Sequence, residues 1–243
     1  MKTYDIIAAI HATIGALALI TFWTAAIARK GSPVHRKSGK IYLLAIAAVL
    51  LTGAPLAISR FFAGQITGGT FLSFLLVLTA TSAWTSWRAI RDQKSWRNFV
   101  GPVYQLLMWS NLLAGLAVIY VALNIARDPQ VIMLVFAGLG LLLFVNMYRF
   151  ARKEPTDPRW WLGQHLGSML GNGIATHIAF LSLGLPRLMP QIAGPGLQMM
   201  AWFGPVVVSA IAGVYLTRKY LKPRRVAVQK NPNQQGTLHV PRQ

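Results

Sequence analysis

Long runs of hydrophobic residues dominate the chain, and short polar segments separate them. Each run is close to the roughly 20 residues that an α-helix needs to cross the hydrocarbon layer of a bilayer. Such runs are unlike the short periodic stretches of a soluble domain. The pattern therefore predicts an all-α, polytopic integral membrane protein with seven transmembrane helices. The expected spans are residues 6–28, 41–59, 70–88, 99–126, 131–148, 161–185 and 197–217.

Residues that favour helix ends support these divisions. Ser32 and Pro33 have the residue types of an N-cap and a first helical position, ahead of the second span. Three prolines are expected between spans, namely Pro129, Pro186 and Pro195. The fourth run is longer than a straight crossing requires, so we expect a tilt or an interfacial turn there.

Composition and charge add an orientation to this fold. Of the 243 residues, 54% are hydrophobic and only 12% are charged, against about 25% charged in soluble domains. Twenty of the 24 Lys and Arg residues fall in the segments 29–40, 88–97 and 149–159 and in the tail from Arg218. Cytoplasmic loops collect Lys and Arg, so we predict an outer N-terminus and an inner C-terminus. The expected domains are a seven-helix unit at 1–220 and a basic, disordered cytoplasmic tail at 221–243.

The same charge distribution limits the partners. Because the net charge of +19 marks one side of a bilayer, we expect lipid as the partner and no nucleic acid. The chain has no cysteine, which excludes disulfides, Cys-ligated zinc and a thiol nucleophile. Phosphate-binding loops, H-E-x-x-H and nucleophile elbows are also missing from the sequence, so no enzyme class is predicted.

Histidine is the candidate for chemistry inside the membrane, because no Lys, Asp or Glu lies deep in any span. His11 and His177 are expected in the outer half, and His35 and His165 at the inner boundary. Neutral imidazole is a common ligand of haem iron, copper and zinc. The leading hypothesis is a redox or metal-binding protein that holds b-type haem, or a copper or zinc ion, through these four histidines.

Helical geometry tests the arrangement of these ligands. His165 and His177 are 12 residues apart, about 18 Å along a helix and about 120° apart around it. They do not share a face, which weakens a stacked two-haem arrangement. Pairing of the first and sixth spans would bring His11 close to His177.

Polar and small residues give further candidates on the sixth span. Met169, Asn172 and Thr176 form a stripe on the face of His165. The opposite face carries a small-residue seam for close helix packing, made of Gly163, Gly167 and Gly171.

Two alternatives need no cofactor. The first is a small-molecule permease or exporter, whose path is lined by Gln105, Asn111, Asn172 and Thr176. The second is an accessory subunit, or a homo-oligomer, that docks a partner membrane helix on the glycine seam. In either case the histidines have packing or gating roles.

Two segments resemble a family of multi-pass bacterial membrane proteins that is carried as a domain of unknown function. They are His35-Arg36-Lys37-Ser38-Gly39-Lys40-Ile41-Tyr42 and the run Gln164-His165-Leu166-Gly167-Ser168-Met169-Leu170-Gly171, continued by residues 174–181. The likeness covers about the first 60 residues and the last third of the membrane domain. It implies a location in the bacterial inner membrane and is consistent with the number of spans, but it implies no activity.

Overall fold

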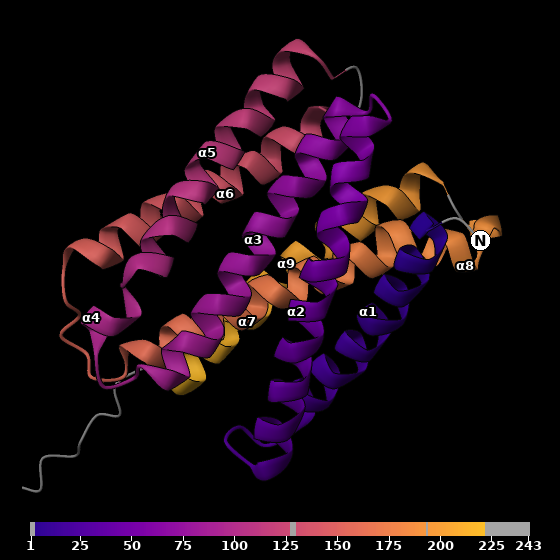
Figure 1. Cartoon of the computed structure of the whole chain (residues 1–243). Helices are drawn as coiled ribbons and strands as arrows, with labels where there is room; N and C mark the ends of the chain where they lie inside the picture. The colour runs from indigo at the N-terminus through magenta and orange to yellow at the C-terminus, as the bar shows by residue number, and fades with distance from the viewer. Residues whose placement is uncertain (1–2, 127–129, 193, 222–243) are drawn as a thin grey trace, which may run out of the picture.

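The computed structural model describes residues 3–126, 130–192 and 194–221, and in this part of the chain it contains helices and no strand. Seven helices are long and apolar enough to cross a membrane (Figure 1). They are α1 (Thr3–Ile27), α2 (Pro33–Phe62), α3 (Ile66–Arg91), α5 (Pro102–Asn124), α6 (Gln130–Arg152), the segment Trp160–Leu188 that begins with α7 (Trp160–Ile178), and α9 (Pro195–Tyr220). The predicted all-α polytopic fold is confirmed.

Helix α2 begins well before the hydrophobic run that predicted it. Ser32 is the N-cap, and its side-chain oxygen accepts a hydrogen bond from the backbone N–H of His35 at 3.2 Å. Pro33 occupies the first turn, where a missing N–H is tolerated. Hydropathy alone missed these turns because they carry Arg36, Lys37 and Lys40; the capping residues located the start correctly.

The long fourth run is interrupted, as expected. A short helix, α4 (Trp96–Phe99), precedes α5, and the break falls at Val100 and Gly101. Pro102 opens α5, and a proline disfavours helical geometry in the residue before it. The interfacial turn therefore absorbs the excess length.

The sixth span continues through a proline that we expected to end it. Helix α7 passes into a π-helical turn at Ala179–Gly184 and then into α8 (Leu185–Leu188). Pro186 has no N–H and its ring crowds the carbonyl of Ser182, four residues earlier. The wider turn accommodates this clash, so the expected boundary at Pro186 is wrong.

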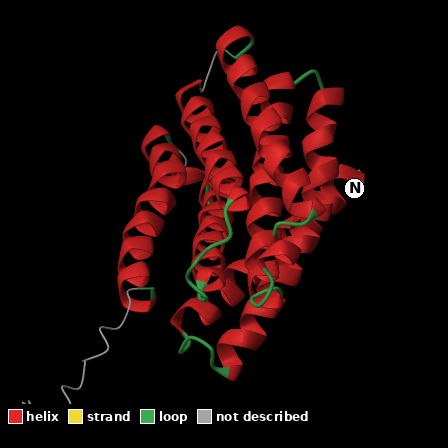
Figure 2. Cartoon of the chain, turned by 90° about the vertical axis from the view of Figure 1, so that its left-hand side faces the viewer, coloured by secondary structure: helices red, strands yellow, loops and turns green. Residues whose placement is uncertain are grey.

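Helix α3 lies at the centre of the bundle. It packs against α2, α5 and α7, while α1 packs against α2, α6 against α5, and α9 against α7 (Figures 1 and 2). We call one end of the bundle the basic end: α1, α3, α6 and α9 end there, and α2, α5 and α7 begin there. The basic loops identified in the sequence lie at this end.

The surface is that of an integral membrane protein. Large apolar side chains such as Leu44, Leu51 and Ile211 are largely exposed, whereas Thr81, Asn111 and Asn172 are completely buried. Hydrocarbon can cover exposed apolar side chains, but backbone and polar groups within a bilayer must find partners inside the protein. The tail expected to be disordered lies outside the described residues from 222 onward.

Candidate functional site

Both ring nitrogens of His177 are engaged within the protein. The indole N–H of Trp23, which can only donate, bonds to Nε2 at 2.9 Å. Nδ1 must then carry the proton, and it donates to the carbonyl oxygen of Gly173 at 2.7 Å. The rings of Phe22 and Trp23 pack edge-on against the imidazole, with centroids 5.4 and 5.5 Å away. His177 is thus a bridge between α7 and α1, with no lone pair left for a ligand in this arrangement.

His11 has one nitrogen engaged. Its Nδ1 lies 2.9 Å from Oγ1 of Thr52 on α2. That hydroxyl donates its own proton to the carbonyl of Ala48, so it accepts from the imidazole. The Nε2 atom of His11 has no hydrogen bond in the described part of the chain.

The structure does not bring His11 and His177 together. His177 contacts Phe22 and Trp23, and Trp23 lies 12 residues beyond His11, about 18 Å further along α1. Helix α7 thus meets α1 near the basic end and not at the depth of His11. The expected outer pair is therefore absent.

His35 lies in the first turn of α2, at the basic end. Its Nδ1 donates to the backbone carbonyl of Ala25, in the last turn of α1, at 2.9 Å. The ammonium of Lys30 donates to the same carbonyl at 3.2 Å. Cationic donors at the C-terminus of a helix satisfy its unpaired carbonyls and complement its dipole.

His165 has the same arrangement on α7. Its Nδ1 donates to the backbone carbonyl of Ser86 on α3 at 3.0 Å. Thr85 and Ser168, on the same two helices, share a hydroxyl hydrogen bond of 2.7 Å. The α3–α7 contact therefore holds the His165 ring through Nδ1, as α1 holds the His35 ring.

His35 and His165 lie near the starts of α2 and α7, on helix faces that lead to a contact between the two helices further along. Tyr42, two turns after His35 on the same face, bonds through its hydroxyl to Oγ1 of Thr176 at 2.9 Å. Met169, one turn after His165, packs against the cluster that contains Tyr42. Neither imidazole has a hydrogen bond at Nε2 among the residues that the structure describes.

The surroundings of this pair are strongly basic. Burial lowers the pKa of the Lys30 ammonium, and the charge of Lys219 lowers it further. Arg36, Lys37 and Lys40 are exposed on the first turns of α2. A positive local charge favours an anionic ligand over a bare cation.

Asn172 and Thr176, the polar residues of the stripe on α7, are buried and have few hydrogen-bond partners. Thr176 donates to the carbonyl of Asn172 as well as sharing the bond with Tyr42. Asn172 is fully buried and neither side-chain polar atom has a partner among the described residues. Asn111, on α5, donates to Thr81 and to the carbonyl of Leu107, both at 2.7 Å.

The glycine seam is close-packed at one position only. A methyl group at Gly171 would lie 2.9 Å from the hydroxyl oxygen of Ser82, whereas at Gly163 it would make an ordinary contact with Leu221. At Gly167 it would meet nothing within 4 Å. Docking of a partner helix on this face stays a prediction.

Sequence reasoning did not identify the groups that hold the histidines. The polar run of the third span, Thr81-Ser82 and Thr85-Ser86, was visible in the sequence. Ser82, Thr85 and Ser86 meet α7, whereas Thr81 meets Asn111 on α5. Tyr42 belongs to the segment 35–42 that resembles the bacterial family, but the resemblance assigned no role to it. Trp23 and the carbonyl of Ala25 carry no sequence pattern that assigns them to a histidine.

Within the described ranges, no group of three or more His, Cys, Asp or Glu side chains could hold a metal ion. Any centre built on histidine there is limited to two such ligands. No family model, curated protein or solved structure matches the chain. The resemblance to a bacterial membrane protein family, and the inner-membrane location that it implies, therefore stay predictions.

Proposed function

We propose that this integral membrane protein is a redox protein that binds b-type haem at the basic end, where Nε2 of His35 and Nε2 of His165 would hold the iron. One observation carries the proposal. Each ring donates Nδ1–H to a backbone carbonyl, of Ala25 or of Ser86, and has no hydrogen bond at Nε2 within the described ranges.

This arrangement is what a metal-ligating histidine requires. The ligating nitrogen must be unprotonated, and a carbonyl on the opposite nitrogen fixes the tautomer, orients the ring and raises its basicity. His177 lacks this property because Trp23 donates to its Nε2 atom. His11 has a free Nε2 atom but faces Thr52 and no second histidine.

Local charge favours haem over a lone copper or zinc ion. The pair lies beside Lys30 and the basic first turns of α2, where a divalent ion would be repelled. A haem has two carboxylate groups that would be stabilised by these cations. Two histidines are also the full protein ligand set of a bis-histidine haem, whereas structural zinc is almost always four-coordinate.

The haem, when bound, would supply one-electron chemistry, and the surrounding residues would set its position, its reduction potential and its access to water. His35 on α2 and His165 on α7 would hold the group in place. Their hydrogen bonds to Ala25 and Ser86 adjust ligand basicity and, through it, the reduction potential. The aromatic and aliphatic residues around Tyr42 limit access of water from the middle of the bundle.

The test is a reduced-minus-oxidised visible spectrum of the protein, purified in mild detergent from cells supplied with a haem precursor, together with haem and metal analysis. We expect about one haem per chain in the unmodified protein. His35→Gln and His165→Gln should each lose most of it, because each removes one of the two nitrogens that would hold the iron.

His11→Gln and His177→Gln are the matched controls, since they make the same change at the other two membrane histidines. They should retain the spectrum. A protein without haem, or a spectrum that depends on His11 and His177 and survives both changes at the basic end, would overturn the proposal. If the protein held stoichiometric copper or zinc and no haem, the cofactor assignment would change to that metal, and the histidine pair would remain the proposed site.

A further inference from the structure

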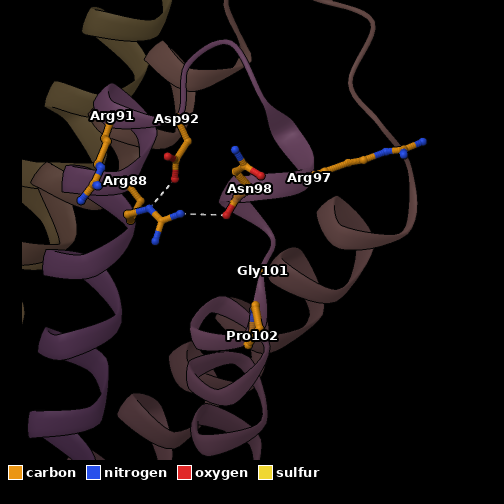
Figure 3. Close-up of a pocket in the computed structure, with 7 residues that line it drawn as sticks. All are labelled: Arg88, Arg91, Asp92, Arg97, Asn98, Gly101 and Pro102. Atoms are coloured by element: carbon orange, nitrogen blue, oxygen red, sulfur yellow. Dashed lines mark hydrogen bonds and ion pairs between the residues drawn. The ribbon is translucent and has the colours of Figure 1, made fainter.

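A hollow of about 380 Å³ lies at the basic end, between the last turn of α3 and the start of α5. Figure 3 shows the residues that line it: Arg88, Arg91, Asp92, Arg97, Asn98, Gly101 and Pro102. It is separate from the histidine pair, whose rings are held by Ala25 and Ser86.

The charges of this hollow are not balanced. The charge of Arg88 is already paired, because its guanidinium forms an ion pair with Asp92. It also donates to the carbonyl of Asn98 at 2.9 Å (Figure 3). Arg91 and Arg97 are exposed and have no ion pair in the part of the chain that the structure describes. In Figure 3 they extend to opposite sides of Arg88, with Arg97 reaching outward from the rim. The lining therefore has two unpaired positive charges.

Neighbouring tryptophans place the hollow at the depth of lipid headgroups. The guanidinium carbons of Arg88 and Arg91 lie 5.2 and 5.3 Å from the ring centroids of Trp84 and Trp87. These rings belong to the last two turns of a spanning helix, and Trp at such positions sits at the membrane–water interface. Trp87 is 43% exposed, so its ring is available to acyl chains next to the hollow.

We propose that this hollow binds the phosphodiester headgroup of an anionic phospholipid, with Arg91 and Arg97 at its two sides supplying the unpaired positive charge that attracts the phosphate. Basic pockets at the ends of spanning helices on the cytoplasmic side suit such headgroups. Guanidinium groups bind phosphate oxygens through parallel N–H donors, which a single ammonium cannot do. A lipid is the expected source because the hollow opens where a span leaves the bilayer and has an exposed Trp at its side.

The experiment is a titration of the purified full chain with phosphatidylglycerol or phosphatidylcholine, with bound lipid counted by native mass spectrometry. Each basic side chain near an anionic lipid contributes roughly a factor of five in affinity. Arg91→Gln combined with Arg97→Gln should therefore weaken phosphatidylglycerol binding by roughly 25-fold and leave phosphatidylcholine binding unchanged. Both side chains are exposed, so the variant should fold.

The matched control is Arg149→Gln combined with Lys153→Gln, which removes two exposed cations from the end of α6 at the same end of the bundle. It should bind phosphatidylglycerol like the unmodified protein. If both double variants lost affinity for phosphatidylglycerol equally, the effect would be one of general surface charge, and the proposed site would be wrong. Complete competition by inorganic phosphate at the lipid's concentration would identify a soluble anion and overturn the lipid assignment.

Discussion

At the scale of single residues, two buried asparagines differ in what surrounds their amides. Asn111 has its nitrogen bonded to Thr81 and Leu107, whereas Asn172 has neither amide atom bonded among the described residues. Both are completely buried. Burial of an unpaired amide costs free energy, while a made hydrogen bond recovers it.

Substitution by leucine, which is close in volume, separates the two cases. Asn172→Leu should leave the free energy of unfolding unchanged or raise it by about 1 kcal/mol, because it removes two unpaired polar atoms. Asn111→Leu should lower it by about 1 kcal/mol, because it breaks two hydrogen bonds inside the membrane. Reversible unfolding in mixed micelles measures both. A larger loss in Asn172→Leu would contradict this assignment, and a loss of vesicle uptake in that variant would favour the permease alternative.

For His35 and His165 the sequence predicted the end of the bundle at which each residue lies, whereas the expected shared depth of His11 and His177 was wrong, and the hydrogen-bond partners of all four were not predicted. Counting along a helix gives the distance of a residue from the helix end, and His35 and His165 both lie within the first two turns of their helices, at the basic end. Partners depend on how helices cross. The bond between Trp23 and His177 requires α7 to meet α1 near the basic end, and no hydropathy pattern contains that crossing.

At the scale of elements, the contact between α7 and α1 depends on a glycine outside the predicted seam. A methyl group at Gly173 would lie 2.6 Å from the Cζ atom of Phe22. The Phe22 ring cannot easily move, because the rings of Trp23, Tyr42 and His177 surround it at centroid distances of 5.4 to 5.8 Å. The close approach at this position therefore holds the two helices together.

Two alanine substitutions on α7 test this contact. Gly173→Ala should destabilise the protein by about 1–3 kcal/mol, because the added carbon overpacks a rigid cluster. Gly167→Ala has open space around it, and it should be neutral or stabilise by up to about 1 kcal/mol through helix propensity. Thermal unfolding in detergent compares them. If Gly167→Ala proved the more damaging change, the packing face of α7 would be the predicted seam.

The ends of helices were predicted correctly where the sequence has clear capping residues or a hydrophobic run of unusual length. Ser32 and Pro33 located the start of α2, and the long fourth run broke at Gly101 and Pro102. The failure at Pro186 has a physical reason. A π-helical turn relieves the clash of a proline ring with the preceding turn, so a proline near a span end does not always stop the helix.

At the scale of the whole molecule, charge and fold agree on one orientation. Seven spans put the two ends of the described chain on opposite sides of the bilayer. The segments 29–40, 88–97 and 149–159, all at the basic end, hold 13 of the 24 Lys and Arg residues, so the positive-inside rule predicts that this end faces the cytoplasm. The haem and lipid proposals then both concern the cytoplasmic side, where anionic headgroups are abundant.

The absence of cysteine makes this orientation directly testable. Ala63→Cys and Gln93→Cys each introduce one thiol at an exposed position, the first beyond α2 and the second beyond α3. In intact spheroplasts, a membrane-impermeant maleimide should label the Ala63 variant and should not label the Gln93 variant. Permeabilised cells should label both, which controls for reactivity. Labelling of the Gln93 variant alone in intact spheroplasts would invert the topology, and both proposed sites would then face outward.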